Sequence, residues 1–214
     1  MRGPEQLGPY SLLQTEGVFP LGEDALALGA FAALRPRWKV CDLGTGSGCL
    51  LLMLVGREPT LRLWGVDREA AAVQAARGNL ARNGLEGEIW LGDWENAPFV
   101  PGSFDLVISN PPYFASGSGG DSGPARMEER ETSLDDLCRT AARLIRNGGR
   151  FALCFRPERL ADLFDALRKN GLEPKRLQFA AHSPAHRPCL ALVEAVRQGR
   201  PGLDVLPLLC RDDR

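Results

Sequence analysis

The sequence predicts a doubly wound α/β fold, in which helices cover both faces of a mostly parallel sheet. Short apolar runs alternate with segments of helical composition along most of the chain. Nearly every run is followed by glycine or a polar residue, as at the ligand-binding ends of parallel strands. The last two runs have no helix between them, which predicts an antiparallel hairpin at one edge of the sheet.

The chain is expected to enter this sheet through a helix. Residues 1–23 are rich in turn-forming residues and show no clear periodicity. Asp24 is a good N-cap for the alanine- and leucine-rich segment 25–34, and Pro36 should stop the helix that this segment forms.

The rest of the chain supplies the strands and the further helices. Strands are expected over residues 38–43, 61–66, 88–91, 104–109, 150–155, 174–179 and 189–196. Helices are expected over residues 46–57, 68–83, 133–146 and 157–170. The pattern is that of a Rossmann-like, seven-stranded sheet. It forms a single globular unit over residues 39–214, which the entry segment and helix of residues 1–38 precede.

Turn-forming residues separate the middle elements. Residues 115–125 are rich in glycine and serine, which indicates a flexible loop. Ser133 should open the next helix, with Asp136 in the capping-box position, and Asn147-Gly148-Gly149 should end it.

Charge and cysteine usage narrow the class of protein. The net charge is −1, but residues 1–124 carry 9 Lys/Arg and 14 Asp/Glu, whereas residues 125–214 carry 17 and 13. The basic C-terminal part is compatible with binding of a polyanion, and a chance surface imbalance is the equal alternative.

The six cysteines form no C-x-x-C pair, so we interpret them as free thiols, mostly buried, in a reducing compartment. The apolar stretches are too short to span a membrane, and residues 1–10 hold no signal core, which predicts a cytoplasmic protein.

Three strand ends form a candidate cofactor site. The first strand runs into Asp42-Leu43-Gly44-Thr45-Gly46-Ser47-Gly48, where alternating glycines allow close approach of the backbone to a ligand. Asp67, followed by Arg68, ends the second strand and can accept hydrogen bonds from both hydroxyls of a ribose. Asp93-Trp94 ends the third strand. An acid before G-x-G-x-G resembles the first motif of the S-adenosylmethionine methyltransferases, rather than the G-x-G-x-x-G of nicotinamide-binding folds.

The fourth strand ends in the candidate catalytic motif, Asn110-Pro111-Pro112-Tyr113. An amino group on adenine or on an amide is a poor nucleophile while its lone pair is delocalised. The side-chain oxygen of Asn110 and the carbonyl of Pro111 can accept its two N–H bonds and aim the lone pair at a methyl group. The two prolines hold these acceptors rigidly, and Tyr113 offers a face for stacking. The chemistry requires neither a metal nor a covalent intermediate, so an amino-nitrogen methyltransferase is predicted.

The resemblance to one family extends over nearly the whole chain. Gln14, the run Leu21-Gly22-Glu23-Asp24, Asn110 to Phe114, Arg130-Glu131 and residues 156–160 are similar to bacterial N6-adenine methyltransferases of valine tRNA. Residues 172–177, 192–195, 202–203 and 207–208 follow the same pattern. Two departures are the glycine-rich loop after Phe114 and Glu129-Arg130-Glu131 in place of Arg-His-Glu.

The resemblance implies the cofactor, its contacts and the partner. S-adenosylmethionine would be converted to S-adenosylhomocysteine. Its contacts would come from the first two strand ends (Asp42, Gly44, Thr45, Gly46, Gly48, Asp67 and Arg68), from Asp93 at the adenine amino group with Trp94 beside the ring, and from Asn110. Asp24 would help to close the pocket. The implied partner is RNA, with tRNA favoured, no membrane is involved, and a monomer is the favoured oligomeric state.

The basic C-terminal part of the chain supplies candidate phosphate contacts. It also contains two histidines, which are too few to predict a metal site. The candidate contacts are Arg126, Arg130, Arg156, Lys175, Arg176 and Arg187. His182 and His186 have H-x₃-H spacing without further ligands nearby, so no metal site is predicted.

Several alternatives stay open. The acceptor could be another RNA or a glutamine of a protein, although a glutamine methyltransferase of release factors would have a helical domain before the glycine loop. A DNA methyltransferase would need an added recognition region. A catalytically silent binding module would not need an intact Asn110-Pro111-Pro112-Tyr113. An NAD-dependent oxidoreductase is disfavoured by the glycine spacing.

Overall fold

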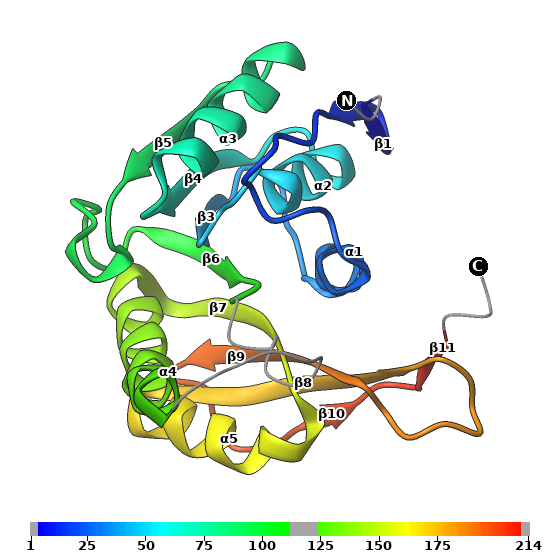
Figure 1. The fold of residues 1–214 in the computed structure, drawn as a ribbon. Coiled ribbons are helices and arrows are strands. Elements are labelled where there is room, and N and C mark those ends of the chain that lie inside the picture. The colour runs from blue at the N-terminus through cyan, green and yellow to red at the C-terminus, as the bar shows by residue number, and fades with distance from the viewer. Residues whose placement is uncertain (1–3, 112–123, 211–214) are drawn as a thin grey trace.

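The structure is a computed structural model that describes residues 4–111 and 124–210, with the side chains of residues 124–133 left out. It consists of one large mixed sheet between two layers of helices (Figure 1). The strand order is β10-β8-β9-β7-β6-β3-β4-β5, and β11 also pairs with β8. The doubly wound α/β prediction is therefore confirmed.

Seven strands form the predicted sheet. They are β3 (Lys39–Leu43), β4 (Arg62–Asp67), β5 (Gly87–Leu91), β6 (Phe104–Ser109), β7 (Ile145–Phe155), β8 (Leu172–Ala181) and β9 (Leu190–Arg197). Strands β3 to β7 pair in parallel, and β9 is antiparallel to both β7 and β8, as expected for the hairpin. Two further strands that sequence reasoning missed, β10 (Asp204–Val205) and β11 (Leu209–Cys210), pair with β8, so the hairpin does not form the outermost edge.

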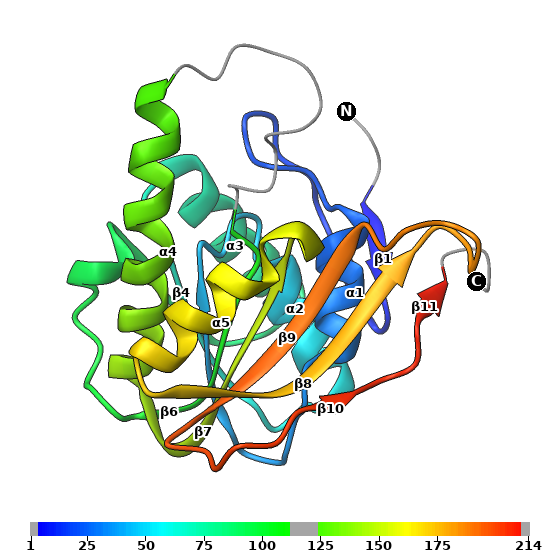
Figure 2. The same ribbon diagram turned by 90° about the horizontal axis from the view of Figure 1, so that it is seen from below.

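The helices divide between the two faces of the sheet (Figures 1 and 2). One face carries α1 (Glu23–Phe31), α2 (Cys49–Arg57) and α3 (Ala70–Arg82), and the other carries α4 (Pro124–Leu144) and α5 (Leu160–Lys169). Successive strand residues point to opposite faces, so Cys154 packs with the first layer while Leu153 packs with the second. The short 3-10 helices η1 (Trp94–Asn96) and η3 (Pro157–Arg159) follow β5 and β7.

Three local predictions were wrong. Residues 5–12 form a hairpin of β1 (Glu5–Leu7) and β2 (Tyr10–Leu12), whose strands are too short to show periodicity. Helix α1 is capped at Gly22, so Asp24 lies in its first turn. A carboxylate is stabilised there by the positive end of the helix dipole. Helix α4 begins at Pro124 rather than at Ser133, because Pro fits the first turn of a helix.

The middle of the chain also departs from the predicted boundaries. Asn147–Gly149, which were expected to end the helix, lie within β7. The register of the pairing between β7 and β6 shifts in this part of the strand. The predicted loop over residues 115–125 lies almost wholly outside the described residues. The division between residues 1–38 and 39–214 stays a proposal, since α1 packs against α2 within the core of the larger unit.

All six cysteines are free, as predicted, and four of them are buried: Cys41, Cys138, Cys154 and Cys210. Among residues 4–111 and 124–210, no helix has both the length and the apolar character that crossing a membrane would require.

Candidate active site

The glycine loop joins β3 to α2 at the carboxyl edge of the sheet. Gly44, Gly46 and Gly48 have φ values of +77°, +55° and +79°, a region that other residues rarely adopt. The backbone N–H groups of Gly44 and Thr45 both donate to the Val66 carbonyl, at 2.9 and 3.0 Å. The loop is therefore fastened to the end of β4.

Buried polar atoms without partners gather in this part of the chain. Both carboxyl oxygens of Asp42, the Thr45 hydroxyl and the Trp94 indole N–H are buried and make no hydrogen bond. Such groups are rare in folded proteins unless a ligand or water meets them. Burial raises the pKa of Asp42 to about 7, and the nearby Thr45 hydroxyl, which falls short of hydrogen-bond geometry, offsets part of this rise.

These atoms fit S-adenosylmethionine. An anion and a hydroxyl suit the positively charged amino-acid end of the cofactor, and an aromatic ring suits its adenine. The Trp94 ring flanks the loop, because a Cβ on Gly44 would stand 3.7 Å from it. The Gln14 side-chain oxygen is a further unpartnered buried atom, in the entry segment.

Asp67 lies at the end of β4, as predicted, but both of its oxygens already have partners. Oδ2 accepts from the Gly46 N–H at 2.8 Å, and Oδ1 accepts from the Glu69 N–H at 3.0 Å. Each carboxylate oxygen can accept more than one bond, so a ribose contact stays possible. Arg68 forms an exposed ion pair with Glu69. The structure thus gives Asp67 an additional role, which is to hold the glycine loop.

Asp93 caps the short helix η1 and is exposed. Its Oδ1 accepts from the Glu95 N–H at 3.1 Å, which leaves Oδ2 free for a further donor. The Gly92 N–H donates to the Asp67 carbonyl at 2.9 Å, so the ends of β4 and β5 are joined. Asp42, Asp67 and Asp93 therefore end neighbouring strands, as the sequence predicted.

The candidate catalytic turn follows β6, and two side-chain hydrogen bonds hold its first residues. The buried Ser109 hydroxyl donates to the Leu43 carbonyl at 2.7 Å, which ties β6 to β3. The buried Cys154 thiol on β7 donates to Asn110 Oδ1 at 2.8 Å. Asn110 itself is half-buried and Pro111 is buried, while Pro112 and Tyr113 lie outside the described residues.

Asp24 lies in the first turn of α1, whose buried residues pack in the same core layer as Cys154. Burial raises the pKa of the Cys154 thiol, and the negative charge of the Asp24 carboxylate raises it further. Helix α1 thereby brings a half-buried acid to the side of the sheet on which the Asn110 turn is held. Its expected part in closing the cofactor pocket stays a prediction.

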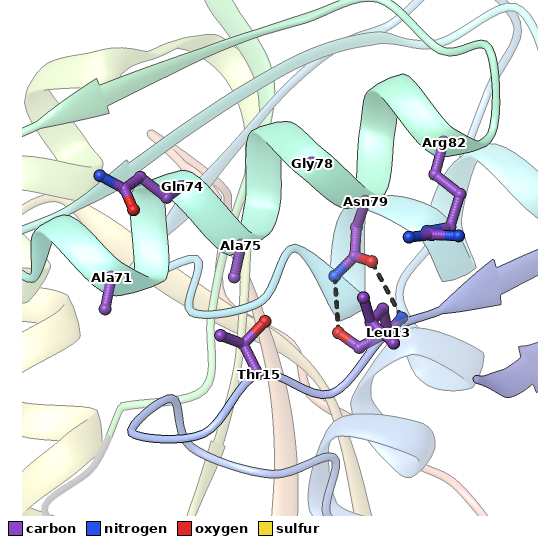
Figure 3. Close-up of a pocket in the computed structure, with 8 residues that line it drawn as sticks. All are labelled: Leu13, Thr15, Ala71, Gln74, Ala75, Gly78, Asn79 and Arg82. Carbon is purple, nitrogen blue, oxygen red and sulfur yellow. Dashed lines mark hydrogen bonds between the residues drawn. The ribbon is translucent and has the colours of Figure 1, made fainter. Parts of the chain in front are cut away.

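Sequence reasoning missed Ser109, Cys154 and Asn79 as residues that shape the site. Asn79 on α3 is buried and bonds both backbone groups of Leu13, at 2.9 and 3.1 Å, and the Ser47 carbonyl at 3.0 Å. It lies beside an open hollow of about 270 Å³ between α3 and the entry segment (Figure 3), lined by Leu13, Thr15, Ala71, Gln74, Ala75, Gly78, Asn79 and Arg82. Ser109 and Cys154 lie at strand ends, which marks their position but not their bonds, and the sequence around Asn79, inside α3, carries no such signal.

The candidate phosphate contacts have different environments. Arg176 pairs with the buried Glu194 at 3.4 Å and lies 4.6 Å from the Phe31 ring, so its charge is already paired within the fold, and its role as a phosphate contact stays a prediction. Lys175 donates to the Arg200 carbonyl. Arg187 is exposed in the turn between β8 and β9, and Arg156 is half-buried at the end of β7. Arg126 and Arg130 lie outside the described side chains.

The two histidines lie in the same turn between β8 and β9. Within the described part of the chain, no three His, Cys, Asp or Glu side chains are grouped so that they could hold a metal. His186 Nδ1 instead lies 2.7 Å from the Ser183 hydroxyl.

Several similar curated proteins carry the names of RNA methyltransferases. A tRNA1(Val) (adenine(37)-N6)-methyltransferase of Parabacteroides distasonis is 28% identical over 194 residues, which cover 88% of this chain and 81% of that protein. The protein of the same name from Porphyromonas gingivalis is 31% identical, with coverage of 72% and 65%. A ribosomal RNA small subunit methyltransferase C of Salmonella paratyphi B is 37% identical over 141 residues, which cover 62% of this chain and 36% of that protein.

Solved structures agree on the fold. A predicted O-methyltransferase of Agrobacterium tumefaciens superimposes with a TM-score of 0.70 at 23% identity, covering 87% of this chain and 86% of that one. A geranyl diphosphate methyltransferase in complex with GPP and sinefungin gives a TM-score of 0.61 at 15% identity, with coverage of 82% and 78%. Residues 12–162 match the methyltransferase small domain family. The chain therefore belongs to that family, among the class I S-adenosylmethionine-dependent methyltransferases.

Proposed function

We propose that this methyltransferase acts on the exocyclic N6 of adenine in tRNA. The observation that carries the proposal is the placement of Asn110. It follows β6 directly beside the glycine loop of β3, and its side-chain oxygen is held in place by Cys154. The names of the relatives from P. distasonis and P. gingivalis support tRNA adenine as the acceptor.

Asn110 and Pro111 would present acceptors to the amino group. A carboxamide oxygen has two lone pairs, so Asn110 Oδ1 can accept a substrate N–H while the Cys154 thiol occupies the other position. The Pro111 carbonyl would accept the second N–H. Together they would turn the nitrogen lone pair toward the methyl donor, and alignment of this kind supplies up to about 7–11 kcal/mol of a reaction barrier.

The cofactor would lie against the glycine loop, where it supplies a methyl group carried on a positively charged sulfur. Asp42, Thr45 and Trp94 would meet its polar groups, and Asp67 and Asp93 would reach its ribose and adenine. The Ser109 bond to the Leu43 carbonyl fixes the catalytic turn relative to this loop. After transfer, the extra proton on the methylated nitrogen would point at Asn110 Oδ1 or at the Pro111 carbonyl before it leaves to solvent.

Ribosomal RNA is the second candidate acceptor, because the relatives named as ribosomal RNA methyltransferases reach 37% identity. They match over a smaller part of this chain than the P. distasonis enzyme does. We therefore place tRNA first. The enzyme would act in the cytoplasm, where tRNA and ribosomes are found. It would act as a monomer.

The test is methyl transfer from labelled S-adenosylmethionine to unmodified tRNA, ribosomal RNA, DNA and a protein extract, each offered separately. We expect N6-methyladenosine in tRNA. Asn110→Ala should lower kcat about 10²- to 10³-fold, as loss of one preorganised polar contact does in other enzymes. Asn147→Ala, an exposed asparagine at the opposite edge of the sheet, is the matched control.

Label in ribosomal RNA or in protein would overturn the acceptor but keep the mechanism. Full activity of Asn110→Ala would overturn the mechanism itself.

A further inference from the structure

The turn between β8 and β9, residues 182–189, lies at the same edge of the sheet as the catalytic turn. Strand β7 is parallel to β6, so its last residue, Phe155, lies at the edge where Asn110 follows β6. Phe155 pairs with Ala191 of β9, and Leu190 pairs with Ala180 of β8. The chain therefore turns from β8 into β9 at the carboxyl edge, and Figure 2 shows this orange turn projecting there.

The separation between the catalytic turn and the β8–β9 turn suits a substrate that extends beyond its target nucleotide. In the strand order, β9 and β8 are two and three positions from β6. At the usual spacing of neighbouring strands, these positions are about 10 and 14 Å away. An RNA substrate that extends several nucleotides beyond the methylated base would therefore reach this part of the carboxyl edge.

The turn is exposed, and its only charged side chain is basic. It reads His-Ser-Pro-Ala-His-Arg-Pro-Cys, which includes no Asp or Glu. Arg187 is exposed and makes no ion pair with the residues that the structure describes. In contrast, Arg150 and Arg176 pair with Glu194, and Arg168 pairs with Glu173. Arg187 is thus available for an anion from outside the chain.

Internal bonds shape the turn in advance. The Ser183 hydroxyl lies 2.7 Å from His186 Nδ1, and the His186 N–H donates to the Ser183 carbonyl at 3.0 Å. The Cys189 N–H donates to the Ala180 carbonyl at 2.9 Å. Because Ser183 occupies Nδ1, the Nε2 atom is the ring nitrogen that is left to meet a ligand. A turn already ordered loses little conformational entropy on binding.

The two histidine rings add flat surfaces. The ring centroids of His182 and His186 are 6.2 Å apart and the rings are nearly perpendicular, at 81°. Rings at exposed positions can stack on bases, and Nε2 can bond a phosphate oxygen. A free arginine beside two imidazoles is a combination that suits an RNA backbone.

We propose that the β8–β9 turn is a docking surface for the sugar-phosphate backbone of the RNA substrate, with Arg187 as its main phosphate contact. This inference rests on the proposed function in that RNA is the acceptor. It assigns a surface that the catalytic turn does not include, and it is tested by binding rather than by turnover.

The primary test is binding of fluorescently labelled, unmodified tRNA to the full chain, measured by anisotropy at several salt concentrations. Arg187→Glu should weaken binding about tenfold at low salt and should reduce the slope of log affinity against log salt by about one. Affinity for S-adenosylmethionine, measured by calorimetry, should be unchanged.

Arg200→Glu is the matched control, because it makes the same charge change beyond the other end of β9. Arg200 is also exposed and lies past Arg197, at the edge opposite the catalytic turn. We expect its tRNA affinity to change less than threefold. Equal weakening by the two variants would mean that only net charge matters, and would overturn the docking surface.

An independent measurement uses the exposed thiol of Cys189 in the same turn. Saturating tRNA should slow its alkylation by a maleimide at least about fivefold. An unchanged rate in the presence of bound tRNA would overturn the proposal, as would an unchanged tRNA affinity of Arg187→Glu. Failure of the proposed function gives a different result, since the native protein would then transfer no methyl group to the tRNA that it binds.

Discussion

Two buried carboxylates on opposite halves of the sheet have opposite surroundings. Asp42, at the end of β3, is 1% exposed and makes no hydrogen bond. Glu194, on β9, is fully buried but pairs with Arg150 and Arg176 and accepts the Ala33 N–H at 3.2 Å. Burial alone therefore does not distinguish a structural acid from a functional one.

The partners of each carboxylate explain the difference. Glu194 joins β7, β8 and β9 to the residues after α1, so its charge is satisfied within the fold. Asp42 remains an unpaired buried acid, which stays in a folded protein when a ligand supplies the missing partner. The comparison predicts that Glu194 supports stability and that Asp42 supports binding.

The largest expected effect is on stability, from Glu194→Gln. The change leaves two arginines without their counter-charge, and breaking a fully buried pair costs about 3–5 kcal/mol. Because the arginine side chains are 25% and 27% exposed, we expect a loss of about 2–3 kcal/mol, measured by urea denaturation. The affinity for S-adenosylmethionine should not change.

Glu173→Gln serves as the control for this substitution. Glu173 also pairs with an arginine, Arg168, whose side chain is 58% exposed. Its loss should cost less than about 1 kcal/mol. Similar losses in the two variants would contradict the role given to the Glu194 cluster.

The second prediction concerns Asp42→Asn, which should reverse the pattern. Removing an unpaired buried charge should leave stability unchanged or raise it. The affinity for S-adenosylmethionine should fall about 10- to 100-fold, because a hydrogen bond to a charged group contributes about 1.5–3 kcal/mol. Calorimetry and denaturation on the same preparation check both parts, and a destabilised variant with normal affinity would refute the comparison.

The pH dependence of stability and of cofactor affinity gives a further test of the role of Asp42. Burial raises the pKa of Asp42 from its ordinary 3.8 to about 7 in the folded chain, so the folded state holds this proton more tightly than the unfolded state. The contribution of Asp42 to stability therefore falls as pH rises from about 4 to 7. A cationic ligand requires the ionised form, so cofactor affinity should fall by up to about tenfold per unit as pH drops below 7. Asp42→Asn should remove that dependence in titrations between pH 5.5 and 8.5.

The sequence predicted the sheet and the strand ends better than the bonds between them. The strand over residues 104–109 has the predicted bounds, because apolar runs and turn residues are local signals. The bonds from Ser109 to Leu43 and from Cys154 to Asn110 join residues 66 and 44 positions apart, and no local pattern encodes such contacts. For the same reason the sequence does not reveal that Arg176 pairs with Glu194, which lies opposite it on the next strand.

Asp67 lies between the two extremes, and the smallest expected effect concerns it. It is half-buried, and each of its oxygens has one backbone partner, so part of its charge is satisfied internally. Asp67→Ala should weaken S-adenosylmethionine about tenfold, through loss of a ribose contact and of the bond to the Gly46 N–H. Asp93→Ala, which removes another strand-end acid without touching the glycine loop, separates these causes. If the glycine-loop bond matters, Asp67→Ala should also lower stability by about 1 kcal/mol whereas Asp93→Ala should lower it less, and unchanged cofactor affinity in calorimetry would remove Asp67 from the site.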